Sequence, residues 1–347
     1  MKLLFVLYGF VGGGAERVTS IIASGLAERG YDVTVLSYDV SRSYPMSEKV
    51  KYVYFREGRR LKRRFVLFQD IRRTVKKLKP DVAIGILPLF SFWLRMATLG
   101  LKVKTIAWDH SSFARCKKPT SDEHFIKYWI YPFFARTFAL TQKDQKIAYF
   151  NKNIRVMPNP LTFEPSKQIE EKEPLIIGIG NVSTWRTKGF DYLIKAWAKI
   201  QPQHPEWNLL IAGRGDATYL YSLIAELGCK NVTISSFNKD IIDVYKRASI
   251  FVLSSRTEGF PMVLLEAMSQ GCACVAFDNL GRTEEILGKD AGRLFDTGNV
   301  AQMTEQIEFF ITHPEARVEF GQKAIDRSQL FKTETILDRW EDELKRL

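Results

Sequence analysis

Two carboxylates eight positions apart, Glu258 and Glu266, are the residues whose types and spacing point most directly to chemistry. They bound the segment EGFPMVLLEAM, which is apolar on nearly every face after Pro261 and predicts a buried helix opened by that proline. Glu266 then lies inside a buried helix, where an ionised carboxylate needs a hydrogen-bonding partner. Glu258 precedes the helix N-terminus, where free N–H groups favour a phosphate. The segment therefore offers an anion site and two acceptors for hydroxyl groups, which are the groups that make up a sugar nucleotide.

Two other interpretations fit paired carboxylates. One is a structural helix, with Glu258 in solvent and Glu266 paired to a buried Arg or Lys. The other is a glycosidase, which uses its carboxylates as acid and nucleophile. Nearby cations argue against a glycosidase, because Lys188 precedes Gly189 at a predicted helix start and Arg186 lies two residues earlier. Such cations would neutralise a departing diphosphate, although Arg186 also suits a solvent-exposed loop.

A glycine-rich turn, Gly12 to Gly14, closes the first predicted strand and lets the backbone approach a ligand closely. A dinucleotide site is the rival interpretation, with Asp39 at the end of the second strand as the ribose acid. That fingerprint needs a third glycine where this chain has Arg17, which argues against it. His110 follows another predicted strand, in WDHSS, and is either a structural histidine or part of the site.

The elements that must position these residues form two similar halves. With 347 residues, of which 46% are hydrophobic, the chain has the size and the core for two domains. Each half alternates buried strands with helical patterns, which predicts a doubly wound parallel sheet. The polar stretch LTFEPSKQIEEKEP separates them, giving an α/β domain over residues 1–160 and a second over 161–331. Ligands bind beyond the carboxyl ends of such strands, where these motifs lie.

The net charge of +12 suggests an anionic partner. Residues 58–79 place Phe65, Phe68, Ile71, Val75 and Leu78 at helical spacing, which predicts a face packed on the sheet. The cations that would crowd the outer face are Arg59, Arg60, Lys62, Arg63, Arg64, Arg72, Arg73, Lys76 and Lys77.

A second cluster, FIKYWIYPFFAR at 125–136, is aromatic and basic. Together the two clusters favour attachment of the first domain to an anionic membrane surface. The alternative is a solvated helix face with core aromatics. No recognised nucleic-acid motif accompanies the charge, so we expect no nucleic-acid partner.

Other features limit cofactors and location. Four cysteines, Cys116, Cys229, Cys272 and Cys274, lack metal-ligand spacing. No D-x-D motif occurs, so we expect cations and a helix dipole, rather than a divalent metal, to hold the phosphates. MKLLFVLYGF is too short for a signal peptide and predicts a first strand, and no run is long enough to span a membrane. We expect a cytoplasmic protein.

The motifs taken together resemble one family. Glu258 and Glu266 match the E-x7-E signature of the retaining family 4 glycosyltransferases, which have the GT-B fold of two Rossmann-like domains facing across a cleft. The resemblance covers nearly the whole chain, in order. The matching stretches are GGGAER at 12–17, PNP at 158–160, KG at 188–189, IAGRGD at 211–216, SSRTEGFP at 254–261 and EAMSQGCACVA at 266–276.

The resemblance implies a role for each matching position. Lys188 would hold the diphosphate, with Arg186 in place of the arginine that the family carries at the position of Asn181. Glu258 would contact hydroxyls of the transferred sugar, and Glu266 the ribose. Further donor contacts would come from backbone N–H groups of Phe260, Met262 and Val263, from the loop glycines Gly13 and Gly14, and from Gly213 and Gly215 at the base.

His110 would lie beside the donor sugar and, with Glu258 and Lys188, make up the catalytic set. The resemblance also implies that a final helix, about 332–347, crosses back onto the first, acceptor-binding domain, while the second domain binds the nucleotide sugar.

The expected activity is hexosyl transfer with retention of configuration and without metal or cofactor. A hexose or N-acetylhexosamine would move from a nucleoside-diphosphate sugar, UDP-linked by preference, to a lipid-linked saccharide in bacterial surface polysaccharide, capsule or lipopolysaccharide assembly. Two alternatives remain: a non-catalytic protein that binds sugar nucleotides or polysaccharide, and another GT-B enzyme such as a phosphorylase or a sugar-nucleotide epimerase.

Overall fold

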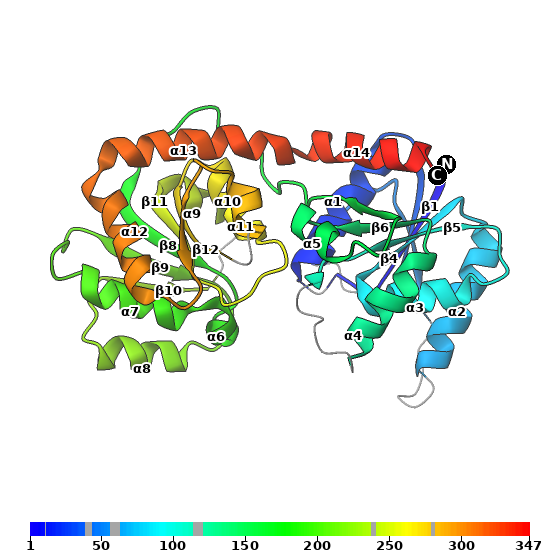
Figure 1. Ribbon diagram of the computed structural model, residues 1–347, viewed down its shortest axis with the longest axis horizontal. Coiled ribbons are helices and arrows are strands. Elements are labelled where there is room, and N and C mark those ends of the chain that lie inside the picture. Colours follow the sequence, from blue (N-terminus) through cyan, green and yellow to red (C-terminus); the bar gives the residue numbers. More distant parts are fainter. Residues whose placement is uncertain (11, 39–43, 56–62, 114–120, 237–240, 279–281) are drawn as a thin grey trace. The chain divides into compact units, whose positions relative to one another are not determined.

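A computed structural model describes residues 1–10, 12–38, 44–55, 63–113, 121–236, 241–278 and 282–347 (Figure 1). The chain divides into two compact units, Met1–Thr162 with Thr333–Leu347, and Phe163–Lys332. The sequence placed the boundaries after residues 160 and 331. Several expectations fall outside the described residues, namely those for Asp39, Arg59, Arg60, Lys62, Cys116 and a helix start near Lys239.

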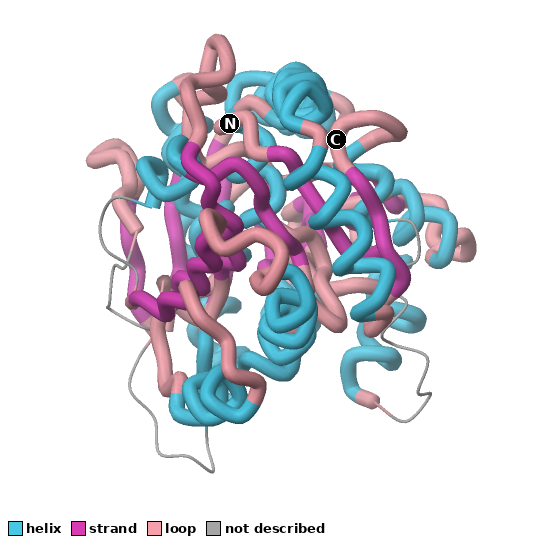
Figure 2. Tube along the Cα trace, turned by 90° about the vertical axis from the view of Figure 1, so that its left-hand side faces the viewer, coloured by secondary structure: helices cyan, strands magenta, loops and turns pink. Residues whose placement is uncertain are grey.

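The first unit is built on a parallel sheet with the order β3-β2-β1-β4-β5-β6-β7 among the described residues. Its strands are β1 Lys2–Leu7, β2 Asp32–Ser37, β3 Lys51–Tyr54, β4 Val82–Ile86, β5 Lys104–Trp108, β6 Arg136–Ala139 and β7 Ile154–Val156. The central strands are buried nearly end to end, because helices pack on both faces of the sheet. Figure 2 shows the strands of the protein in magenta with helices in cyan around them.

The helices of this unit lie on two sides of the sheet, with α1 and α14 on one side and α2 and α3 on the other (Figure 1). They are α1 Gly14–Glu28, α2 Arg63–Leu78, α3 Leu87–Ala97, α4 Asp122–Phe125, the π-helical turn η3 Ile126–Ile130, the 3-10 turn η4 Tyr131–Phe133, α5 Gln142–Ile147 and α14 Thr333–Lys345.

Helix α14, from the end of the chain, completes the core of the first unit. Trp340 is fully buried, with its ring centroid 4.7 Å from that of Trp108 and 4.9 Å from that of Phe138. Arg29, the C-cap residue of α1, forms ion pairs with Asp338 at 2.7 Å and Glu341 at 3.1 Å, both on α14. These contacts explain why residues 333–347 fold with the first unit.

The second unit repeats the architecture with the sheet order β10-β9-β8-β11-β12-β13, again all parallel, in the part described. Its strands are β8 Glu173–Ile179, β9 Asn208–Ala212, β10 Val232–Ser235, β11 Ala248–Leu253, β12 Ala273–Asp278 and β13 Arg293–Asp296. Two parallel-sheet α/β units confirm the predicted fold class.

The helices of the second unit also cover both faces, with α7 and α8 on one side and α10 and α13 on the other (Figure 1). They are the 3-10 turn η5 Val182–Thr184, α6 Trp185–Lys188, α7 Phe190–Ile200, α8 Thr218–Glu226, α9 Ile241–Arg247, α10 Met262–Ser269, α11 Arg282–Leu287, α12 Val300–Thr312, α13 Pro314–Ser328 and the 3-10 turn η6 Gln329–Phe331. The stretch NVSTWRT, expected as a loop, folds into η5 and α6.

The basic segments are less exposed than the sequence suggested. Arg72, counted among the outer cations of α2, donates hydrogen bonds to the carbonyls of Ala97 and Leu99, both at 2.9 Å, and so caps the end of α3. Phe65, expected to face the sheet, is 63% exposed, because the core contacts of α2 begin at Leu67 and Phe68.

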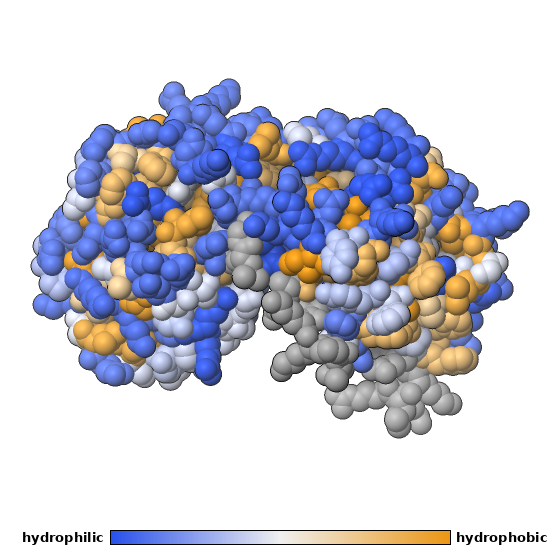
Figure 3. Space-filling model, in the orientation of Figure 1, coloured by the Kyte–Doolittle hydropathy of each residue, from blue (hydrophilic) through white to orange (hydrophobic). Residues whose placement is uncertain are grey.

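The second basic and aromatic cluster, 125–136, divides between core and surface. Its Lys127 is fully buried, and Tyr131 and Phe134 belong to a core cluster. Phe125, Trp129 and Phe133 are exposed. Hydrophobic and hydrophilic residues are interspersed over the visible surface (Figure 3). Among the described residues, no helix combines the length and apolar character needed to cross a bilayer.

Candidate active site

The second unit brings Lys188 and Glu258 together at the carboxyl edge of its sheet. Lys188 Nζ donates to Glu258 Oε1 at 2.8 Å, and Ser255 Oγ donates to the same oxygen at 2.7 Å. The lysine and glutamate side chains are 25% and 15% exposed, so both remain reachable from solvent. The two residues follow β8 and β11, which are neighbours in the sheet.

A glycine allows this approach of two loops. Gly189 adopts a left-handed conformation with φ of 67°, and a Cβ there would lie 1.8 Å from the carbonyl oxygen of Ser254. Ser254 Oγ donates to the carbonyl of Lys188 at 2.9 Å, and the Arg256 N–H donates to the carbonyl of Thr187 at 2.8 Å. Lys188 is therefore held by backbone contacts that only glycine at position 189 permits.

Arg256 is a second residue that organises this edge, although the sequence analysis did not single it out. Its guanidinium donates to both carboxylate oxygens of Asp191 at 2.7 Å each and lies 3.7 Å from the ring centroid of Tyr192. The hydrogen bonds from the guanidinium to Asp191 raise the pKa of Arg256. It also contacts the carbonyl of Arg186, whose own side chain is exposed. Arg256 thus holds the backbone of Arg186, while the Arg186 side chain, which was expected to bind phosphate, is exposed.

Glu266 lies inside α10, 3% exposed, as the apolar sequence around it predicted. It accepts a hydrogen bond from the hydroxyl of Tyr245 at 2.8 Å. Tyr245 belongs to α9 and is itself fully buried. The hydroxyl of Tyr245 is therefore one partner of this carboxylate.

The start of α10 presents backbone groups next to Glu258. Pro261 is the N-cap, with φ of −73° and ψ of 96°, and no side chain caps the helix. Phe260 is buried at 8% exposure, and Met262 and Val263 form the first turn of the helix. An uncapped helix N-terminus offers N–H groups to an anion. The residues expected to supply backbone contacts to a phosphate or sugar thus open an uncapped helix.

A hollow of about 270 Å³ lies at the carboxyl ends of β9 and β10 and includes both predicted base-pocket glycines. A Cβ at Gly213 would lie 1.6 Å from the carbonyl oxygen of Gly180, and one at Gly215, whose φ is 121°, would lie 2.3 Å from Ser183 Oγ. These two glycines are therefore required where the loops after β8 and β9 cross. The remaining lining residues are Val182, Asp216, Ala217, Thr218, Tyr221, Ile234, Ser235 and Ser236.

In the first unit, the glycine-rich loop binds a carboxylate of its own chain. The N–H groups of Gly12 and Gly13 donate to Glu16 Oε2 at 2.8 and 3.0 Å. Gly14, predicted with Gly13 to face a phosphate or the acceptor, is the first residue of α1. The amide of Gly13 is therefore engaged by Glu16, a residue that the sequence interpretation passed over and that a capping-box pattern could have found.

His110 lies just beyond the carboxyl end of β5, and its ring contacts that of Trp108 in a tilted arrangement, with centroids 4.5 Å apart and 48° between the ring planes. Burial lowers its pKa to about 3, which keeps the imidazole neutral. Both ring nitrogens are buried and form no hydrogen bond with the residues described. A neutral imidazole offers one donor and one acceptor, so these nitrogens suit a hydroxyl-bearing ligand.

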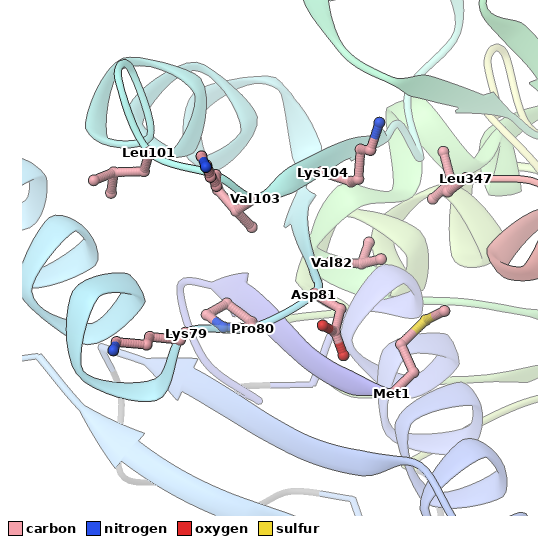
Figure 4. Close-up of a pocket in the computed structure, with 10 residues that line it drawn as sticks. Met1, Lys79, Pro80, Asp81, Val82, Leu101, Val103, Lys104 and Leu347 are labelled. Atoms are coloured by element: carbon pink, nitrogen blue, oxygen red, sulfur yellow. The ribbon is translucent and has the colours of Figure 1, made fainter.

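Two further observations concern ligand and metal sites. A shallow hollow of about 830 Å³ is lined by Met1, Lys79, Asp81, Lys104 and Leu347, among others (Figure 4). It lies where β1, β4 and β5 begin, at the edge opposite the carboxyl ends, and so away from the expected ligand edge. Across the described ranges, no group of three or more His, Cys, Asp or Glu side chains is arranged to hold a metal ion.

Comparison with known proteins identifies the family. The model for "Glycosyltransferase Family 4" matches residues 12–163, and that for "Glycosyl transferases group 1" matches residues 162–327. An uncharacterized glycosyltransferase of Haemophilus influenzae is 30% identical over 94% of this chain and 95% of its own length. The chain belongs to the group 1 glycosyltransferases of family 4, as the sequence motifs indicated.

Two further relatives have more specific names. The amylovoran biosynthesis glycosyltransferase AmsD of Erwinia amylovora is 28% identical, covering 98% of this chain and 99% of its own. A Campylobacter jejuni enzyme, GalNAc-alpha-(1->4)-GalNAc-alpha-(1->3)-diNAcBac-PP-undecaprenol alpha-1,4-N-acetyl-D-galactosaminyltransferase, is 26% identical, covering 98% and 97%.

Solved structures show the same GT-B fold. Sucrose-phosphate synthase from Thermosynechococcus elongatus superposes with a TM-score of 0.83 at 17% identity, covering 99% of this chain and 98% of its own. Anabaena Alr3699/HepE in complex with UDP-glucose gives 0.81 at 18% identity, with full coverage of both chains.

Proposed function

We propose that this glycosyltransferase moves a hexose or N-acetylhexosamine from a UDP-sugar to a lipid-linked saccharide, with retention of configuration, in bacterial surface polysaccharide synthesis. The observation that carries the proposal is the contact between Lys188 and Glu258 at the edge of the second unit, beside the uncapped start of α10. Lys188, Glu258 and the N-terminus of α10 therefore lie around one position at the edge of the second sheet. That combination suits a sugar diphosphate, whose phosphates need positive charge and whose hydroxyls need acceptors.

The donor would lie along the carboxyl edge of the second sheet. The base would occupy the hollow at Gly213 and Gly215, the ribose hydroxyls would reach Glu266, and the diphosphate would lie between Lys188 and the start of α10. Support for a uridine nucleotide comes from HepE, which has been solved with UDP and with UDP-glucose. Arg186, whose side chain is exposed, would add a second cation to the diphosphate.

Transfer would proceed by substitution on one face of the sugar ring. As the bond from the sugar to phosphate breaks, charge grows on the phosphate oxygen, and the Lys188 ammonium stabilises it. That oxygen takes the proton of the incoming acceptor hydroxyl, so no side chain needs to act as a covalent nucleophile. Glu258 accepts hydrogen bonds from sugar hydroxyls. In the first unit, neutral His110 offers a donor and an acceptor to a substrate hydroxyl. The lysine and helix N-terminus would supply the charge that a divalent metal supplies elsewhere.

The names of two relatives support a lipid-linked saccharide as acceptor. One relative carries amylovoran biosynthesis in its name, and another acts on a saccharide linked to undecaprenol through a pyrophosphate. The chain's net charge of +12 and the exposed Arg73, Lys76 and Lys77 on α2 suit the anionic cytoplasmic face of a membrane.

The test is turnover of defined donors. UDP-glucose, UDP-galactose, UDP-N-acetylglucosamine, UDP-N-acetylgalactosamine and GDP-mannose are each incubated with the enzyme, with and without EDTA, while nucleotide release is followed. We expect one UDP-sugar to be cleaved in either condition, and proton NMR to show the α anomer of the released sugar first. Glu258→Gln should retain nucleotide binding and lose turnover. Binding without turnover of any donor would favour a sugar-nucleotide-binding protein, and a β anomer first would contradict retention.

A further inference from the structure

Lys127, in the turn η3, is a fully buried cation outside the set of residues proposed to touch the donor. A buried ammonium is strongly unfavourable unless several groups compensate it. Its Nζ lies 2.9 Å from Asp109 Oδ2 and 3.1 Å from Glu123 Oε1. It also donates to Ser111 Oγ at 2.8 Å and to the carbonyls of Ser111 and Ser112 at 3.2 Å each. The Lys127 ammonium thus contacts several groups of the loop that follows β5.

That loop carries His110 at its centre. Asp109, on one side of the histidine, accepts hydrogen bonds through Oδ1 from the N–H of Ser111 at 2.8 Å and from its hydroxyl at 2.7 Å. Further along, the N–H of Phe113 donates to Asp144 Oδ1 at 2.8 Å. Lys127 binds the residues on both sides of His110, so it closes the turn in which the histidine lies.

Among the described residues, no hydrogen bond holds the imidazole of His110 itself. Its ring nitrogens make no hydrogen bond to any described residue, and its ring contact is with Trp108. The direction in which His110 points is therefore set by the backbone from Asp109 to Ser112. Lys127 holds that backbone at the carbonyls of Ser111 and Ser112, and the Asp109 N–H donates to the carbonyl of Phe138 at 3.0 Å. We propose that Lys127 is a positioning residue, which sets the orientation of His110 for its contact with substrate without reaching the substrate itself. This inference rests on the proposed function.

The test is a double-mutant cycle on turnover of the donor identified above. Lys127→Met keeps the apolar stem and removes the ammonium. Because a displacement of about 1 Å in a positioned group costs about a hundredfold in rate, we expect Lys127→Met and His110→Ala each to lower kcat by up to about that factor, with donor KM little changed. The double variant should be no slower than His110→Ala, since both changes remove one function. Multiplied losses would overturn the proposal.

A matched control breaks another shielded ion pair in the same unit. Arg136 Nε lies 2.9 Å from Glu343 Oε2, with side chains 18% and 11% exposed, and neither residue contacts the His110 loop in the described structure. Arg136→Met should lower the melting temperature and leave kcat of the folded protein unchanged. An equal loss of kcat in Arg136→Met and Lys127→Met would show that the effect of Lys127 is general destabilisation.

Amide hydrogen exchange supplies a readout that does not depend on turnover. Lys127→Met should speed exchange at Ser111 and Phe113 by at least about tenfold, the loss expected for a hydrogen bond to a charged group, while strand β1 is unaffected. If Lys127→Met does not fold, Asp109→Asn/Lys127→Met removes both charges together and is measured instead. Unchanged exchange would overturn the positioning role. An enzyme that cleaves none of the donors would instead contradict the proposed function, and exchange would still decide the role of Lys127.

Discussion

Replacing Lys188 by methionine removes the ammonium that joins the two halves of the proposed donor site and keeps most of the side-chain volume. In the structure, its Nζ lies 2.8 Å from Glu258 Oε1, and the two side chains are 25% and 15% exposed. A hydrogen bond between charged groups contributes about 1.5–3 kcal/mol to stability, and partial exposure reduces this to about 1–2 kcal/mol. For a unit of this size, the melting temperature should fall by about 2–8 °C.

The effect on the donor should be larger than the effect on folding. An ammonium has three donors, and the contact with Glu258 takes one of them. Loss of the remaining donors to a diphosphate should weaken UDP binding by about 1.5–3 kcal/mol, or about 10- to 150-fold in Kd. Because negative charge on the leaving group grows in the transition state, kcat should fall by about a further 10²- to 10³-fold.

The assays are calorimetric titration with UDP and steady-state nucleotide release. Lys195→Met is the matched control, because Lys195 is exposed on α7 in the same unit. We expect the control to match the wild type in both assays. An unchanged Kd and kcat for Lys188→Met would refute the assignment of the lysine to the diphosphate. Equal losses in both variants would point to net charge rather than to the contact with Glu258.

Three further predictions concern neighbouring groups. Tyr245→Phe removes the hydroxyl that donates to buried Glu266 at 2.8 Å and should lower the unfolding free energy by about 1.5–3 kcal/mol, measured by urea denaturation; no change would mean that other donors suffice. Arg256→Lys cannot reproduce the paired hydrogen bonds to Asp191, so it should lower both melting temperature and kcat, whereas an active, equally stable variant would contradict the organising role of Arg256. Burial lowers the pKa of His110 to about 3, below its unfolded value of about 6.5, so the unfolded state binds the extra proton and stability falls as pH drops between these values, by up to about 1.4 kcal/mol per pH unit. His110→Gln removes one titrating group, so the loss of unfolding free energy between pH 7 and pH 5, measured by urea denaturation, should be smaller than in the wild type. An identical loss in both proteins would show that His110 titrates normally.

The sequence placed Lys188 and Glu258 at one edge of a sheet for a topological reason. Lys188 and Glu258 are separated by 70 positions, yet each follows a strand, and parallel strands bring all their carboxyl ends to one edge. β8 and β11 are also neighbours in the sheet, so the loops after them meet. The burial of Glu266 followed equally from the apolar residues around it. Alternation of strands and helices thus predicted both the fold and the edge at which these residues lie.

Partners that depend on side-chain packing could not be predicted in this way. Nothing in the local sequence links Tyr245 to Glu266, because the contact depends on how α9 packs against α10. The charge of Lys127 was counted with a basic surface cluster, but its partner Asp109 is 18 positions away and reaches it only through the fold. Composition alone cannot distinguish a cation that meets solvent from one that organises a loop.

The role of Arg256 could not be predicted for the same reason. Its guanidinium pairs with Asp191, 65 positions earlier in the chain, through the meeting of the loops after β8 and β11. Arg186, which lies beside Lys188 in the chain and has an exposed side chain, stays a predicted phosphate ligand. Glu16 is different, since its position three residues after Gly13 follows the capping-box spacing and was open to prediction.

Thermal unfolding in the presence of nucleotides tests directly whether a UDP-sugar binds to the second unit at the proposed donor site. UDP, GDP and the corresponding sugars are added at about a hundred times their dissociation constants, with magnesium or with EDTA, to the wild type and to Glu266→Ala. A bound ligand at that concentration adds about 2.7 kcal/mol, or about 5–11 °C for a unit of this size. We predict that UDP and one UDP-sugar raise the melting temperature in both buffers and that Glu266→Ala removes the shift. The proposed donor site is contradicted if no nucleotide raises the melting temperature of the wild type. It is equally contradicted if the rise persists in Glu266→Ala.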